Sequence, residues 1–161
     1  MAKAKDSRTS LGGRLHIAKV ILIGLKPLLF DQYLGSNDIK STAIEKVYWD
    51  REGFACIPAL NLFSALTAEN TKSVCKQFYG TRAKKIGMAI NSYLNIKQHT
   101  LTLERSGEKI HRDNFDSAFE IIKHVARLDK GIPNPKERPM LATPWSTSCD
   151  IEFYEYGDCA W

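Results

Sequence analysis

Cations and aromatic side chains occur together in the middle of the chain, and this combination could bind a nucleic acid. Between Glu69 and Glu104 the sequence has no acidic residue but six basic ones. Tyr79 lies among them, and Trp145 follows a proline-rich segment that carries Arg138. Cations hold phosphates, and aromatic rings stack on bases. The residues predicted to form such a site are Lys72, Lys76, Tyr79, Arg82, Lys84, Lys85, Lys97, Arg138 and Trp145.

The distribution of charge leaves other interpretations open. The net charge is +5, but the acids Asp150, Glu152, Glu155 and Asp158 gather near the C-terminus without basic neighbours. The basic stretch could therefore be a solvated helix face, or it could dock on this acidic segment.

Residues suited to metal or covalent chemistry show no specific spacing. The four cysteines form no CxxC pair, and the four histidines form no HxH, HExxH or HxxxH pattern. A P-loop and a GxSxG nucleophile elbow are also missing from the sequence. We therefore predict no metal, no cofactor and no catalytic residue. The enzymatic alternative is an RNA-processing activity that uses His111 or His16 as general acid or base.

The elements that position these side chains fit into one domain. A chain of 161 residues is within the usual size of a single domain. Residues 1–13 are polar and basic, which predicts a flexible arm before a domain over 14–161. The sequence shows no run of about 20 apolar residues and no secretory signal. These features predict a cytoplasmic protein without a membrane partner.

Hydrophobic periodicity predicts strands and helices in a mixed order. Helices are expected over 58–68, 71–79 and 82–93, with Phe78 and Met88 on their buried faces. Strands are expected over 14–24, 46–49, 54–57, 94–104, 121–128 and 147–156. The strand over 14–24 is expected at the centre of the sheet, because its second half is continuously apolar.

Helices follow strands along the chain without strict βαβ alternation, which predicts an α+β fold with a mainly antiparallel sheet and helices on one face. Residues 129–139 are predicted to form a loop, because three prolines interrupt regular pairing. No helix follows the strand over 147–156 to cover its apolar face. We therefore expect missing structure, or a partner that covers this open edge.

Three segments resemble the RAMP superfamily of CRISPR-associated RNA-binding proteins. They are the opening strand over 14–29, the hairpin VYWDREGFACIP over 47–58 and the helix ALNLFSAL over 59–66. Ala59 stands where the family has a glycine, and the family's C-terminal glycine-rich loop has no counterpart. The order of elements also resembles phage-encoded proteins of unknown role, with Arg138-Pro139 and Trp145 before the last strand. The resemblance implies a ferredoxin-like core and single-strand binding.

These observations favour a non-catalytic protein that binds single-stranded RNA or DNA through a basic helical surface and stacking aromatics. The alternative is an interaction or assembly protein. Such a protein would dock a partner chain, or a second copy, through an open edge strand and the acidic C-terminal segment.

Overall fold

The computed structural model describes residues 14–32, 41–68, 74–127 and 133–155. It shows an α+β fold whose strand pairs are all antiparallel, as predicted. The ferredoxin-like arrangement is not confirmed. The predicted arm over 1–13 lies outside the described residues. No helix in the described part of the chain has both the length and the apolar character needed to cross a bilayer.

Two long strands form the spine of the larger sheet. β1 (Arg14–Ile23) pairs along its whole length with β10 (Ser146–Glu155). On its other side β10 pairs with β4 (Leu94–Ile96) and β6 (Glu104–Arg105), and β6 pairs with β7 (Glu108–Lys109). The predictions of strands over 14–24 and 147–156 are confirmed.

The positions of these two strands in the sheet are the reverse of what we predicted. β1 lies at the edge, whereas β10 has paired neighbours on both sides. The inward face of β10 is also covered, because Cys149 and Ile151 pack in one cluster with Leu62. The expectation of an uncovered last strand is therefore wrong, since helices that precede β10 in sequence cover it.

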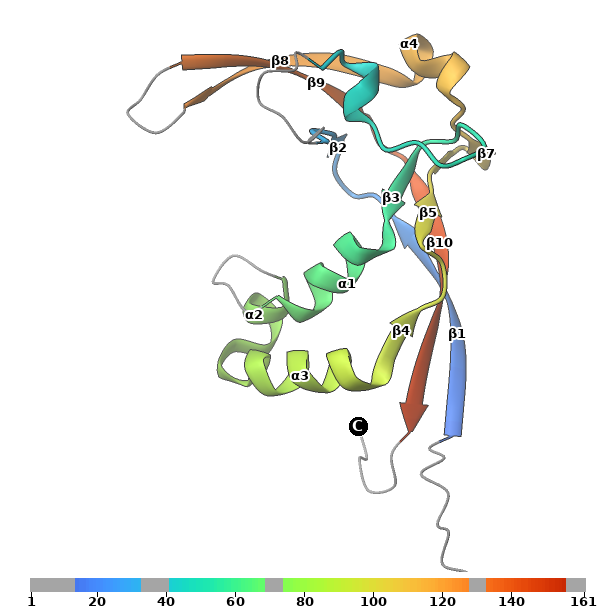
Figure 1. Ribbon diagram of the computed structural model, residues 1–161, viewed down its shortest axis with the longest axis vertical. Helices are drawn as coiled ribbons and strands as arrows, with labels where there is room; N and C mark the ends of the chain where they lie inside the picture. The colour runs from blue at the N-terminus through green and yellow to red at the C-terminus, as the bar shows by residue number, and fades with distance from the viewer. Residues whose placement is uncertain (1–13, 33–40, 69–73, 128–132, 156–161) are drawn as a thin grey trace, which may run out of the picture.

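Three helices lie on one side of the β1–β10 pair (Figure 1). They are α1 (Ala59–Thr67), α2 (Val74–Tyr79) and α3 (Ala83–Tyr93), and the short 3-10 helix η2 (Gly80–Arg82) joins the last two. Pro58 precedes α1, where its missing N–H costs no helical hydrogen bond. α3 approaches α1 closely, since a Cβ at Gly87 would lie 2.9 Å from the carbonyl oxygen of Thr67.

The helices bury smaller side chains than predicted. The fully buried positions of α2 and α3 include Cys75, Ala83 and Gly87. Phe78 is instead 81% exposed, and Met88 is also exposed. The prediction of Phe78 and Met88 as core residues is therefore wrong, because the close contact between these helices selects small residues.

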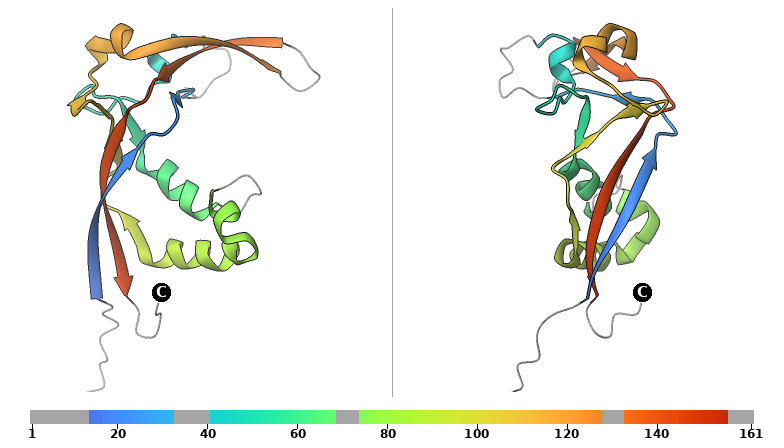
Figure 2. Two further views of the ribbon diagram at one scale, coloured as in Figure 1. Left: turned by 180° about the vertical axis from the view of Figure 1, so that it is seen from behind. Right: turned by 90° about the vertical axis from the view of Figure 1, so that its right-hand side faces the viewer.

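A second sheet contains β2 (Leu28–Leu29), β9 (Pro133–Leu141) and β8 (Phe119–Arg127). β8 and β9 form a long hairpin at the opposite end of the molecule from α3 (Figure 2). The prediction of a loop over 129–139 is wrong for residues 133–139. Pro133, Pro135 and Pro139 occupy alternate positions, and the carbonyl of Pro139 accepts from the N–H of Phe30. Their missing N–H groups therefore all face away from β8.

The main core lies between this second sheet and the connection around residues 43–55. Phe30, Val47, Leu103, Phe119 and Leu141 are buried there. The hairpin predicted over 46–57 is present only in part. Its first strand is replaced at the start by the 3-10 helix η1 (Ile44–Lys46). Its second strand includes the start of β3 (Cys56–Pro58), which pairs with β5 (Thr100–Thr102). The remaining short elements are η3 (Arg112–Asn114) and α4 (Phe115–Ala118).

Candidate nucleic-acid interface

The end of the helical layer that lies farthest from the sheet carries exposed aromatic and basic side chains. There α2 ends, η2 turns and α3 begins (Figure 1). Gly80 makes the turn with a φ of 55°, a conformation that glycine adopts without strain. Exposed side chains on this turn and its flanks are Phe78, Tyr79, Arg82, Lys84 and Lys85. We call these five residues the α2–α3 tip.

The α2–α3 tip is strongly positive. No acidic residue occurs over 74–103, and no ion pair among the described residues uses Arg82, Lys84 or Lys85. The first turn of α3 also contains no acid. Because a helix N-terminus carries partial positive charge, cations there repel it. An anion bound at the tip would relieve this repulsion.

The aromatic rings of the tip are available for stacking. Phe78 is 81% exposed and Tyr79 is 45% exposed, although both belong to a helix whose other face is packed. A single exposed aromatic residue is common, but two adjacent ones beside three cations combine a stacking surface with a phosphate-binding one. The sequence predicted Tyr79 and missed Phe78, because helical spacing alone placed Phe78 in the core.

The other predicted basic residues lie elsewhere or differ in surroundings. Lys76 is on α2 near the tip and is partly buried. Lys97 is exposed but follows β4, where its N–H donates to the carbonyl of Asp150 beside the sheet. Lys72 lies outside the described residues. The structure therefore brings together Tyr79, Arg82, Lys84 and Lys85 but not Lys97.

Arg138 is held in an ion pair within the second sheet. Its Nη2 lies 2.7 Å and its Nε 3.0 Å from Oδ2 of Asp31, and Nζ of Lys136 lies 3.5 Å from the same oxygen. Burial on its own would raise the pKa of Asp31. The hydrogen bond and charge of Arg138, with the charges of Lys136 and Lys46, hold that pKa below its ordinary value. Arg138 thus neutralises a carboxylate and is not part of the tip.

Trp145 is half-buried and uses its indole for contacts within the chain. Its indole N–H donates to the carbonyl of Lys26 over 2.9 Å. The ring covers Gly24, whose ideal Cβ would lie only 2.0 Å from the indole. The N–H of Gly24 in turn donates to the carbonyl of Trp145. The indole therefore fastens the end of β1 to the start of β10.

The two histidines considered for acid–base chemistry are also engaged. Nδ1 of His111 lies 3.3 Å from the backbone nitrogen of Asp113 and 3.2 Å from its Oδ2, and Nε2 lies 3.2 Å from the carbonyl oxygen of Glu52. The ring of His16 stacks on Phe153 with a centroid separation of 4.9 Å. Among the described residues, no group of three or more His, Cys, Asp or Glu side chains is placed to hold a metal ion.

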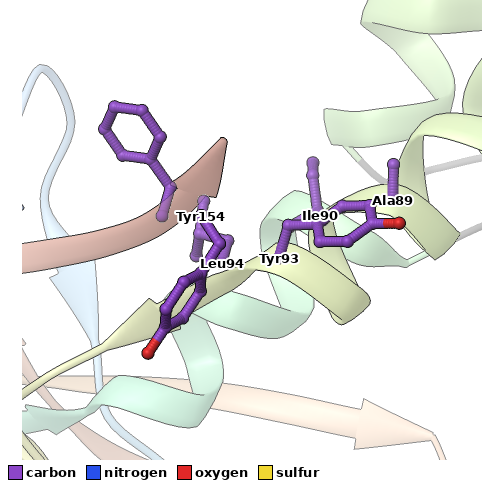
Figure 3. Close-up of a pocket in the computed structure, with 6 residues that line it drawn as sticks. Ala89, Ile90, Tyr93, Leu94 and Tyr154 are labelled. Carbon is purple, nitrogen blue, oxygen red and sulfur yellow. The ribbon is translucent and has the colours of Figure 1, made fainter. Parts of the chain in front are cut away.

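An apolar pocket of about 250 Å³ lies where α3 meets the sheet (Figure 3). Its lining is Ala89, Ile90, Tyr93, Leu94, Phe153 and Tyr154. This lining offers apolar contact and two phenol groups, but no carboxylate, amine or thiol. The pocket is at the opposite end of α3 from the tip, so it does not belong to the same surface.

The described cysteines are buried thiols. Burial, with a smaller contribution from the charge of Asp50, raises the pKa of Cys56 to about 11. Burial also raises the pKa of Cys149. Both thiols are therefore protonated and unreactive near neutral pH, and Cys56 and Cys75 are core residues.

Comparison with known proteins gives no relative. The chain matches no protein-family model, no curated protein and no solved structure. The resemblance to the RAMP superfamily therefore stays a prediction, and the function is argued from the geometry of the chain.

Proposed function

We propose that this protein binds single-stranded nucleic acid without catalysing a reaction, and that the α2–α3 tip is its contact surface. The observation that carries the proposal is the exposure of Phe78 and Tyr79 beside Arg82, Lys84 and Lys85. The cations attract phosphates, and the rings offer flat apolar surfaces for bases.

The exposed rings favour a single strand over a duplex. In a duplex the bases are already stacked, so an aromatic side chain at the surface of the protein cannot reach their faces. A flexible strand can turn its bases toward Phe78 and Tyr79 while its phosphates contact the lysines. Each such stack contributes about 1–3 kcal/mol of binding free energy.

The decisive experiment is a salt titration of oligonucleotide binding, followed by fluorescence anisotropy. The wild-type protein is compared with Lys84→Glu/Lys85→Glu, and RNA and DNA of the same sequence are titrated in parallel. Lys109→Glu/Lys123→Glu is the charge control, because both lysines are exposed and lie on β7 and β8, far from the tip. Lys123 pairs with Glu137 and Lys109 lies over the ring of Phe54, so urea denaturation checks that this control is folded. The two variants carry the same change in net charge.

The proposal requires different responses from the two variants. Losing two phosphate contacts should reduce the slope of log K against log salt by about 1.4 for a single strand. Affinity should fall more than tenfold at low salt for Lys84→Glu/Lys85→Glu, and by less than about threefold for the control. Equal losses in both variants would show that net charge alone drives binding, and no binding by the wild type would refute the proposed function.

The stacking part of the proposal has its own test. Phe78→Ala should weaken oligonucleotide binding about fivefold or more while leaving the free energy of unfolding nearly unchanged, since the ring is 81% exposed. Met88→Ala is a suitable control, because it also removes an exposed apolar side chain from the helical layer. The predicted cytoplasmic location agrees with this function but is not tested by it.

A further inference from the structure

β1 presents an unpaired backbone along one side. It pairs only with β10 in the described part of the chain. The N–H of Gly24 donates to the carbonyl of Trp145 on the β10 side. Because backbone groups alternate along a strand, the even-numbered residues of β1 face β10. The N–H and C=O groups of Leu15, Ile17, Lys19, Ile21 and Ile23 therefore point outward.

The side chains of these same residues are also exposed. Leu15, Ile17, Ile21 and Ile23 are 45–67% exposed, and Lys19 lies at the midpoint of this apolar row. The even-numbered side chains lie on the opposite face, where Val20 packs with the helical layer. A long apolar edge of this kind is a template for another strand.

We propose that this protein forms a two-fold symmetric dimer in which β1 pairs antiparallel with β1 of a second copy. A two-fold axis at Lys19 would place the two lysines directly opposite each other, which is destabilising. Shifting the axis to Ala18 pairs Ile17 with the partner's Lys19, and Leu15 with the partner's Ile21. The outward backbone groups of each pair then bond to each other.

Charge complementarity favours the axis at Ala18 over one at Val20. Within each chain Glu152 lies beside Ile17 across β10 and β1. With the axis at Ala18, the partner's Lys19 lies on the other side of Ile17, two strand spacings from Glu152, or roughly 9–10 Å. Lysine and glutamate side chains can span that separation. With the axis at Val20, the partner's Lys19 would lie near Ser148 instead.

A second copy suits this edge for a further reason. The row is self-complementary, since its apolar residues flank a single cation at the centre. Lys19 lies opposite Asp150 of its own chain, and the axis at Ala18 brings Glu152 of the other copy near it as a second acid. The two-fold axis also runs perpendicular to the sheet, so the helical layers of both copies lie on the same side and do not obstruct the pairing.

The oligomeric state is measured by sedimentation equilibrium over a wide range of protein concentration. Ile17→Pro removes an N–H that faces outward, so the β1–β10 hydrogen bonds remain. Ile17→Val is the matched control, because it keeps both the N–H and a β-branched side chain. We expect dimers for the wild type and Ile17→Val, and monomers with an unchanged circular dichroism spectrum for Ile17→Pro.

Disulfide formation tests the register and does not depend on the proline variant folding. Both cysteine variants are made in a Cys149→Ala/Cys159→Ser background, because Cys149 lies directly opposite Val20 within the chain. Ala18→Cys brings two cysteines together at the axis, where Cα atoms of such a pair are about 4.5 Å apart. Mild oxidation should therefore cross-link Ala18→Cys but not Val20→Cys. A monomeric wild type, dimers that persist in folded Ile17→Pro, or cross-linking of Val20→Cys instead of Ala18→Cys would each overturn the proposal.

Discussion

Gly24→Ala tests whether the indole of Trp145 fastens β1 to β10. Gly24 is buried beneath the ring, and an added Cβ would lie 2.0–2.4 Å from three of its atoms. Real Cβ atoms do not approach other atoms this closely, so the indole must move. Moving it lengthens or breaks the hydrogen bond from its N–H to the carbonyl of Lys26.

The expected cost follows from these contacts. Overpacking a filled site costs about 1–3 kcal/mol, and losing one hydrogen bond costs about 1 kcal/mol. Replacing glycine by alanine stiffens the unfolded chain and returns about 0.4–1 kcal/mol. We therefore expect the free energy of unfolding to fall by about 2 kcal/mol.

Urea denaturation followed by far-ultraviolet circular dichroism measures this loss without using tryptophan fluorescence. The control is the same substitution in a Trp145→Ala background, where the ring is gone and Gly24→Ala should cost less than about 0.5 kcal/mol. If Gly24→Ala costs the same in both backgrounds, the ring does not cover Gly24, and Trp145 becomes available again for the predicted stacking on bases.

Three other measurements test packing and charge. Asp31→Asn should lower the free energy of unfolding at pH 7 by about 1 kcal/mol. In the wild type, the lowered pKa of Asp31 gives stability that is present above the unfolded pKa and is lost as the pH falls through the folded pKa. The variant should therefore show a flatter pH dependence of stability below pH 5. Urea midpoints across pH show this directly. Alkylation of Cys56 and Cys149 at pH 8, read by mass spectrometry, should require denaturant, because burial raises both thiol pKa values; rapid labelling of the native protein would contradict this. Gly87→Ala should destabilise α3 by about 1–2 kcal/mol in thermal melts despite the higher helix propensity of alanine, because its Cβ would meet a carbonyl of α1.

Local patterns in the sequence were enough to find most elements. The β-branched run at 14–24, the alternation at 147–156 and the helical spacing at 58–68 depend only on neighbouring residues, and all three elements are present.

Strand partners and buried helix faces could not be predicted in the same way. β1 is apolar on both faces, which is typical of a central strand, yet it lies at the edge. The prolines of β9 occupy alternate positions, and this spacing matters more than their number. Because of it, the backbone hydrogen bonds between β9 and β8 remain intact. Phe78 was misplaced because α2 packs through Cys75 against the start of α3, and that contact depends on the tertiary arrangement.

The sequence predicted the basic stretch that contributes to the candidate surface, but it could not predict which side chains gather there. Lys84 and Lys85 belong to the acid-free stretch that was predicted to bind nucleic acid, and both lie at the tip. Arg138 and Trp145 have side chains of the kind that bind phosphates and bases. Within the folded chain they contact Asp31 and Gly24, which lie more than a hundred residues away in sequence. Only the folded chain shows that these groups are already paired.

The two proposals have a joint geometric consequence. A two-fold axis perpendicular to the sheet keeps both helical layers on one side, so a β1-paired dimer would present two α2–α3 tips in the same direction. A strand long enough to reach both tips would bind the second one at a raised effective concentration, without any new type of contact. A modest set of phosphate and stacking contacts on each copy could then hold a long strand firmly and release a short one, which makes the length of the nucleic acid itself a determinant of affinity.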